Sequence, residues 1–127
     1  MKTPELTTER LLLRPFLQKD AEEVFACWES DPDVAKYMFW SSHHDKSKTA
    51  AWVTEEREKI DGDDWYRWAL VLKKTGELVG TGLIYWEEEY GKFEIAYNLG
   101  KKAWGKGYAT EAMREILRFA KQELNIT

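Results

Sequence analysis

The hydrophobic period of this chain changes between residues 99 and 108, and that change limits the folds it can adopt. Residues 92–99 have the composition of a β-strand, whereas apolar residues further on recur at helical spacing. The members of this helical stripe are Ala109, Ala112, Met113, Ile116, Leu117 and Ala120. Glycines 100, 105 and 107 occupy the join. The chain therefore passes tightly from strand to helix, where backbone N–H groups can approach an anion.

Upstream of this junction, the sequence predicts a strand, two helices and a meander of three strands. We expect strands over residues 8–16, 66–73, 77–86 and 92–99, helices over residues 19–29 and 45–60, and a short helical turn through Val34, Tyr37 and Met38. Gly80 and Gly82 indicate a bulge or a close backbone neighbour within the third of these strands. This order predicts an α/β fold of the α+β type, with a mixed, largely antiparallel sheet flanked by helices.

The composition favours a single domain over residues 1–127, because no repeat, linker or low-complexity stretch interrupts the chain. A net charge of −4 argues against non-specific binding to nucleic acid. We expect no membrane association, and a cytoplasmic location, because no apolar run resembles a signal peptide or a membrane span. The single cysteine, Cys27, is expected to be a buried thiol.

Two polar features have alternative interpretations. The segment from Gly100 to Gly107 nearly matches a phosphate-binding P-loop, but Gly107 stands where that motif needs Ser or Thr for magnesium. A nucleotide hydrolase is therefore disfavoured, while a purely structural tight turn remains open. His43 and His44 are adjacent and have no further ligands at zinc-site spacing, so we predict no metal site.

The segment Trp104-Gly105-Lys106-Gly107-Tyr108-Ala109-Thr110-Glu111-Ala112 resembles the acetyl-CoA pyrophosphate loop of the GNAT N-acetyltransferase superfamily. The nearest branch is that of the RimJ/RimL-type protein N-terminal acetyltransferases. The opening segment from Thr8 to Pro15, the Gly80-x-Gly82 strand and the segment from Glu94 to Leu99 follow the same family order. One departure is Trp104, which replaces the usual Arg or Gln and removes a polar donor.

The resemblance implies an acetyl-CoA-dependent N-acetyltransferase that transfers an acetyl group to an amine by direct attack. The acceptor would be a protein N-terminus or a small-molecule amine. The residues expected to bind acetyl-CoA are Tyr97, Asn98, Leu99, Trp104, Gly105, Lys106, Gly107, Tyr108, Ala109 and Thr110. Glu94 would be the general base, and the backbone N–H of Leu99 would stabilise the oxyanion.

In the family pattern, a further strand, a helix and a hairpin follow the helix that ends near Leu124. We therefore expect the chain to be the N-terminal portion of a GNAT domain, incomplete at its C-terminus, or to pair its exposed sheet edge in a homo-oligomer. The alternative function is a truncated, non-catalytic CoA-binding or assembly module.

Overall fold

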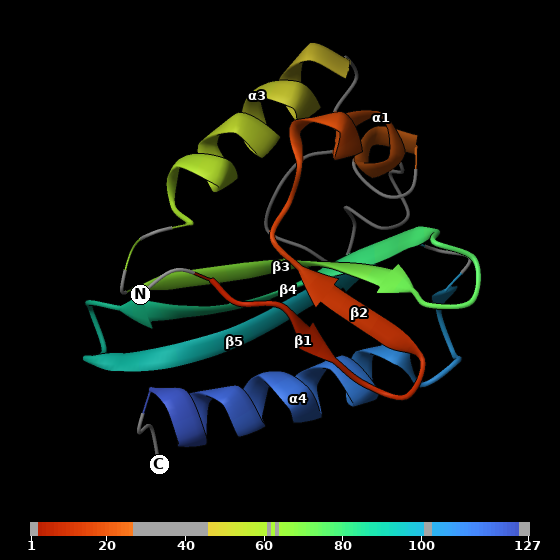
Figure 1. The fold of residues 1–127 in the computed structure, drawn as a ribbon. Coiled ribbons are helices and arrows are strands. Elements are labelled where there is room, and N and C mark those ends of the chain that lie inside the picture. The colour runs from red at the N-terminus through yellow and green to blue at the C-terminus, as the bar shows by residue number, and fades with distance from the viewer. Residues whose placement is uncertain (1–2, 27–45, 61, 63, 101–102, 125–127) are drawn as a thin grey trace.

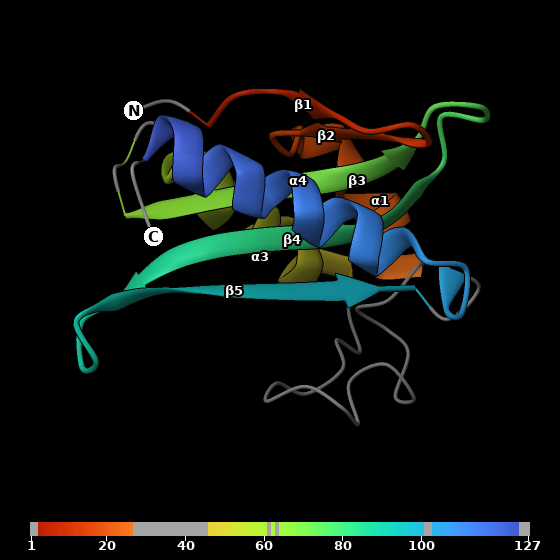
Figure 2. The ribbon, with the colours of Figure 1, turned by 90° about the horizontal axis from the view of Figure 1, so that it is seen from below.

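The computed structural model describes residues 3–26, 46–60, 62, 64–100 and 103–124, which contain a five-stranded antiparallel sheet (Figure 1). The strands are β1 (Leu6–Thr7), β2 (Leu11–Arg14), β3 (Trp65–Leu72), β4 (Leu78–Glu87) and β5 (Lys92–Leu99). Each strand pairs with its neighbour in sequence, and β1 and β5 form the two edges of the described sheet (Figure 2). The predicted α+β class and the meander of three strands are confirmed.

Helices cover both faces of this sheet. The long helix α4 (Tyr108–Glu123) crosses one face, whereas α1 (Ala21–Val24) and α3 (Lys46–Glu58) lie on the other (Figures 1 and 2). A 3-10 turn over Gln18–Asp20 leads into α1. The end of the predicted helix over residues 19–29, the turn through Val34, Tyr37 and Met38, and Cys27 lie outside the described residues.

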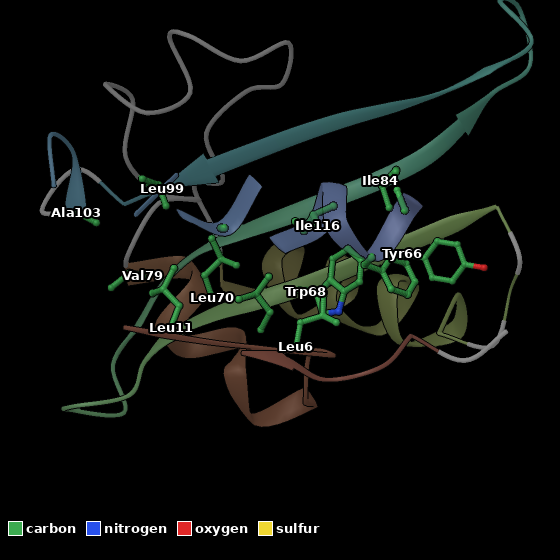
Figure 3. Packing of buried hydrophobic residues seen from close by; sticks show 14 residues of the cluster. Leu6, Leu11, Tyr66, Trp68, Leu70, Val79, Ile84, Leu99, Ala103 and Ile116 are labelled. Carbon is green, nitrogen blue, oxygen red and sulfur yellow. The ribbon is translucent and has the colours of Figure 1, made fainter. Parts of the chain in front are cut away.

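The principal core lies between the sheet and α4. It is built from residues of β1 to β5 that face this helix, together with the apolar stripe of the helix itself (Figure 3). Phe119 meets Trp68 edge-on, with ring centroids 5.4 Å apart. The buried indole N–H of Trp68 donates to the Pro4 carbonyl oxygen at 2.7 Å, so this buried donor has a partner. A smaller cluster around Phe16, Val24 and Val53 fills the other face.

The two glycines of β4 lie at places where side chains from other elements approach very closely. A Cβ atom at Gly82 would lie 2.6 Å from the Ile116 Cδ1 atom on α4, and one at Gly80 would lie 2.4 Å from the Asn98 carbonyl oxygen on β5. The predicted close backbone neighbour is therefore present at Gly80, whereas the close neighbours of Gly82 are side chains. The ladder shifts its register between Leu70 and Val71, opposite this stretch of β4.

The predicted strand over residues 8–16 is wrong at its start, because residues 8–10 form the turn of the β1–β2 hairpin. The Thr8 N–H donates to the Leu11 carbonyl oxygen at 2.9 Å, and the Thr8 hydroxyl accepts from the Leu11 N–H at 3.0 Å. A threonine that bonds locally to the backbone offers an alternative to strand pairing.

In the part of the chain that the structure describes, no helix combines the length and the apolar character needed to span a membrane.

These contacts predict unequal costs for two similar substitutions in β4. Gly80→Ala should lower the free energy of unfolding by about 2–3 kcal/mol, because its Cβ meets backbone that cannot move aside. Gly82→Ala should cost about 1 kcal/mol, because the tip of the Ile116 side chain can shift. Urea unfolding followed by tryptophan fluorescence measures both values. Equal costs, or the reverse order, would contradict this account of the packing.

Candidate functional site

The junction between β5 and α4 exposes a row of backbone donors. Gly105 and Gly107 adopt left-handed conformations, with φ of 75° and 80°, and Gly107 is the N-cap of α4. Among the described residues, none accepts a hydrogen bond from the N–H groups of residues 105–110. The first N–H groups of a helix have no partner within it, and the helix dipole adds positive potential there. This arrangement can bind a phosphate-type anion.

The end of β5 adds outward-facing backbone groups to this row. The Gly100 N–H donates to the Val79 carbonyl oxygen at 2.9 Å. Gly100 and Val79 flank the paired residues Leu99 and Gly80, so Leu99 and Gly80 form a non-hydrogen-bonded pair of the antiparallel ladder. The N–H and C=O groups of Leu99 consequently point away from β4, towards the open edge. By the same alternation, those of Tyr97 point outward and those of Asn98 pair with Thr81.

Side chains in the predicted loop divide between packing and exposure. Tyr108 and Ala109 pack against the core of the sheet, so their N–H groups are what they can offer to a ligand. Lys106 and Thr110 are exposed. The Trp104 indole N–H donates to the Leu99 carbonyl oxygen at 3.0 Å and thereby ties the loop back to β5. Trp104, which stands where the family usually has Arg or Gln, therefore uses its indole N–H for a hydrogen bond within the chain.

The carboxylate of Glu111 joins the junction to the β1–β2 hairpin. One of its oxygens accepts hydrogen bonds from the Thr8 hydroxyl and from the Arg10 N–H, the latter at 2.9 Å. The other accepts from Arg10 Nε at 2.7 Å. Partial burial acts to raise the pKa of Glu111, but the bonds from Thr8 and Arg10 prevail and lower it below its ordinary value. Sequence reasoning missed this cluster, since only the fold brings residues 8–10 to α4.

Glu94, the predicted general base, is half-buried on β5 and directly faces Tyr85 of β4. The Tyr85 hydroxyl donates to Glu94 Oε2 at 3.1 Å and so orients the carboxylate. Burial raises the pKa of Tyr85, and the bond to Glu94 raises it further. The Trp65 ring lies beside Tyr85, with centroids 5.5 Å apart. Tyr85 is a second residue that was missed, because only the strand register shows which residue faces Glu94.

The two predicted catalytic groups, Glu94 and Leu99, do not meet. Leu99 lies five positions after Glu94 along β5, so the strand rise of about 3.3 Å per residue puts their Cα atoms roughly 16 Å apart. The outward N–H of Tyr97 lies closer to Glu94, about 10 Å away by the same measure. A donor at Tyr97 and a base at Glu94 can therefore serve one reacting centre more readily than the predicted pair.

A buried ion pair lies next to Trp65 on the same face of the sheet. Glu56 of α3 is 6% exposed and accepts from the Trp65 indole N–H at 2.6 Å, while Arg67 Nε lies 2.9 Å from its other carboxylate oxygen. Within the described residues, no group of three or more His, Cys, Asp or Glu side chains is arranged to hold a metal ion. His43 and His44 lie outside those residues.

Comparisons with known proteins match this geometry to one family. The family model for the acetyltransferase (GNAT) domain matches residues 10–127. The uncharacterized N-acetyltransferase p20 of Bacillus licheniformis is 34% identical over 122 residues, which are 95% of this chain and 68% of that protein. A crystal structure of a GNAT-family acetyltransferase from Bacillus anthracis shares 28% identity with a TM-score of 0.81, covering 97% of this chain and 69% of that one.

A third similarity is to the microcin C7 self-immunity acetyltransferase MccE, whose crystal structure is described as a complex with acetyl-CoA and AMP. At 17% identity and a TM-score of 0.80, over 93% of this chain and 66% of that one, it shows the shared fold. The chain belongs to the GNAT acetyltransferase family, as the loop at residues 104–112 and its companion motifs predicted. That family carries out acetyl transfer.

The Glu111 cluster predicts how stability depends on pH. Because its pKa is lower in the folded state than the unfolded value of about 4.3, Glu111 stabilises the fold above that value and loses this effect as the pH falls through its folded pKa. Glu111→Gln should therefore lower the free energy of unfolding by about 1–2 kcal/mol at pH 7, and its gap to the wild type should close below about pH 4. Denaturant unfolding from pH 7 to pH 3 measures this.

The matched control is Glu115→Gln, which removes a carboxylate from the same helix that also pairs with an arginine, Arg118, at 2.7 Å. This single i,i+3 pair within one helix should contribute about 0.5 kcal/mol or less. A Glu111→Gln effect no larger than that of the control would show that the cluster does not stabilise the fold.

Proposed function

We propose that this protein is an acetyl-CoA-dependent N-acetyltransferase that moves the acetyl group directly from the thioester to an amine. One observation carries the proposal: the N–H groups of residues 105–110 have no partner among the described residues, and the backbone of Leu99 and Tyr97 on the preceding strand points outward. Coenzyme A has a pyrophosphate joined to an arm that contains two amides, and these two sets of backbone groups offer partners to both parts in that order. Membership of the GNAT family supports the same reading.

In this proposal, backbone groups bind most of the donor. The N–H groups at the start of α4 hold the pyrophosphate, helped by the exposed Lys106 and Thr110 side chains. The outward C=O of Tyr97 and the outward N–H of Leu99 pair with the amides of the pantetheine arm. Gly105 and Gly107 let the backbone approach the anion without a Cβ atom between them. Asn98, whose backbone is paired with β4, can contribute only its side chain.

The reaction requires a deprotonated amine and a stabilised oxyanion. The amine nitrogen attacks the thioester carbonyl carbon, a C–N bond forms, and the C–S bond breaks to release the CoA thiolate, which then takes up a proton. The Glu94 carboxylate accepts the proton of the amine through a water molecule. The outward N–H of Tyr97 replaces that of Leu99 as the proposed oxyanion donor because it is nearer to Glu94.

The neighbours of Glu94 suggest how a cationic acceptor would approach. Tyr85 places an aromatic ring next to the oriented carboxylate, and an ammonium group is attracted both to such a ring and to the negative charge. Either a protein N-terminus or a small-molecule amine has this chemistry.

Saturating acetyl-CoA should raise the melting temperature of the wild-type protein by roughly 8 °C at about one hundred times its Kd. Gly107→Trp should abolish this shift, because the ring fills the space where the anion would lie. Gly76→Trp is the matched control: Gly76 also has a left-handed conformation, with φ of 75°, but lies in the turn after β3. Differential scanning fluorimetry checks all three proteins. A shift that survives in Gly107→Trp would count against this site.

Glu94→Gln should slow thiol release from acetyl-CoA in the presence of a reactive amine by about a hundredfold, because it removes the base. Its affinity for acetyl-CoA should stay within twofold of wild type. The control, Glu88→Gln, neutralises an exposed carboxylate in the turn after β4 and should leave the rate unchanged. Binding of acetyl-CoA by the wild type with no thiol release, across a panel of amines, would instead favour a non-catalytic CoA-binding module.

A further inference from the structure

The side chain of Arg10 extends from the β1–β2 turn into the proposed pyrophosphate loop and contacts three of its residues. Arg10 Nη1 donates to the Lys106 carbonyl oxygen at 3.0 Å. The guanidinium carbon lies 4.6 Å from the centre of the Tyr108 ring, and Nε bonds to Glu111 at 2.7 Å. A segment almost one hundred residues away in sequence therefore holds this loop from the side of the hairpin.

The peptide unit between Lys106 and Gly107 needs such a contact to keep a single orientation. Glycine accepts positive and negative φ almost equally, so this unit can rotate at little steric cost. In a planar trans peptide, the carbonyl of one residue and the N–H of the next point in opposite directions. By holding the Lys106 carbonyl towards the hairpin, Arg10 turns the Gly107 N–H to the opposite side of the loop.

Arg10 also offsets a charge that opposes anion binding. Glu111 lies in the first turn of α4, close to the place where a pyrophosphate would sit, and its negative charge would repel that ligand. The bonds from Arg10 and Thr8 engage both carboxylate oxygens and keep them on the hairpin side. Gly107 makes this approach possible, since a Cβ atom there would lie 3.3 Å from Arg10 Nη2.

We propose that Arg10 is a positioning residue for the donor site: it fixes the Lys106–Gly107 peptide so that the Gly107 N–H points at the pyrophosphate of CoA. This inference rests on the proposed function and adds a residue outside the loop to it. Arg10 acts through the backbone that it holds and does not itself contact the ligand. The loop and the hairpin are thus one functional unit, although they lie at opposite ends of the sequence.

The test compares CoA with S-acetylpantetheine, which keeps the pantetheine arm but lacks the pyrophosphate and the adenosine 3'-phosphate attached to it. Arg10→Met should raise the Kd of CoA about tenfold, the order expected for one well-placed hydrogen bond, and leave the Kd of S-acetylpantetheine within twofold. Arg10→Lys keeps the charge but not the forked geometry, and should raise the Kd of CoA about threefold. If Arg10→Met does not fold, the comparison of the two ligands is made with Arg10→Lys instead. Binding titrations monitored by tryptophan fluorescence or calorimetry give these constants.

Arg118→Met is the matched control, because Arg118 is as exposed as Arg10 (43% against 44%) and also pairs with a glutamate at 2.7 Å. It should change neither constant. Equal weakening of both ligands by Arg10→Met would indicate a general loss of structure, and no weakening would remove the role of Arg10; either result overturns the proposal. Failure of the wild-type protein to bind CoA would overturn the proposed function itself, and this inference with it.

Discussion

Gly80 and Gly82 of β4 have no side chains, and this determines how closely the other elements can approach the centre of the sheet. At Gly82, the space is taken by Ile116 of α4, so the helix lies close against the strand. At Gly80, the Leu99 side chain and the Asn98 carbonyl oxygen take the space, which fixes the end of β5. The junction from β5 to α4 begins and ends on elements positioned by these contacts. Its backbone donors are therefore set by packing in the core as much as by the loop itself.

The proposed site divides its tasks between backbone and side chains. Backbone groups of Tyr97, Leu99 and residues 105–110 would bind the donor, and their directions follow from the alternation of the ladder and from the free N–H groups of a helix start. Side chains would handle protons and charge: Tyr85 orients Glu94, and Arg10 with Thr8 engages Glu111. Substitutions in the loop should accordingly affect binding, whereas substitutions near Glu94 should affect the rate.

Periodicity and composition predicted the elements whose order is local. The strand over residues 92–99 and the amphipathic helix after Gly107 were predicted closely, because their patterns are long and regular. The β1–β2 hairpin was missed, since the local bonds of Thr8 and the distant carboxylate of Glu111 decide the turn. The partnership of Tyr85 with Glu94 depends on strand register, and that of Arg10 with Lys106 depends on tertiary folding. Neither leaves a periodic signal in the sequence.

The most direct test of the account is a titration of 15N-labelled protein with CoA, followed by amide chemical shifts. The largest changes should fall on the amides of residues 105–110 and on the outward amides of Tyr97 and Leu99. The amide of Asn98, which pairs with β4, should shift less than either neighbour, and the amide of Gly76 should not move. Saturable changes centred elsewhere, or equal shifts along residues 97–99, would contradict the claim that the strand edge and the helix start form one binding row.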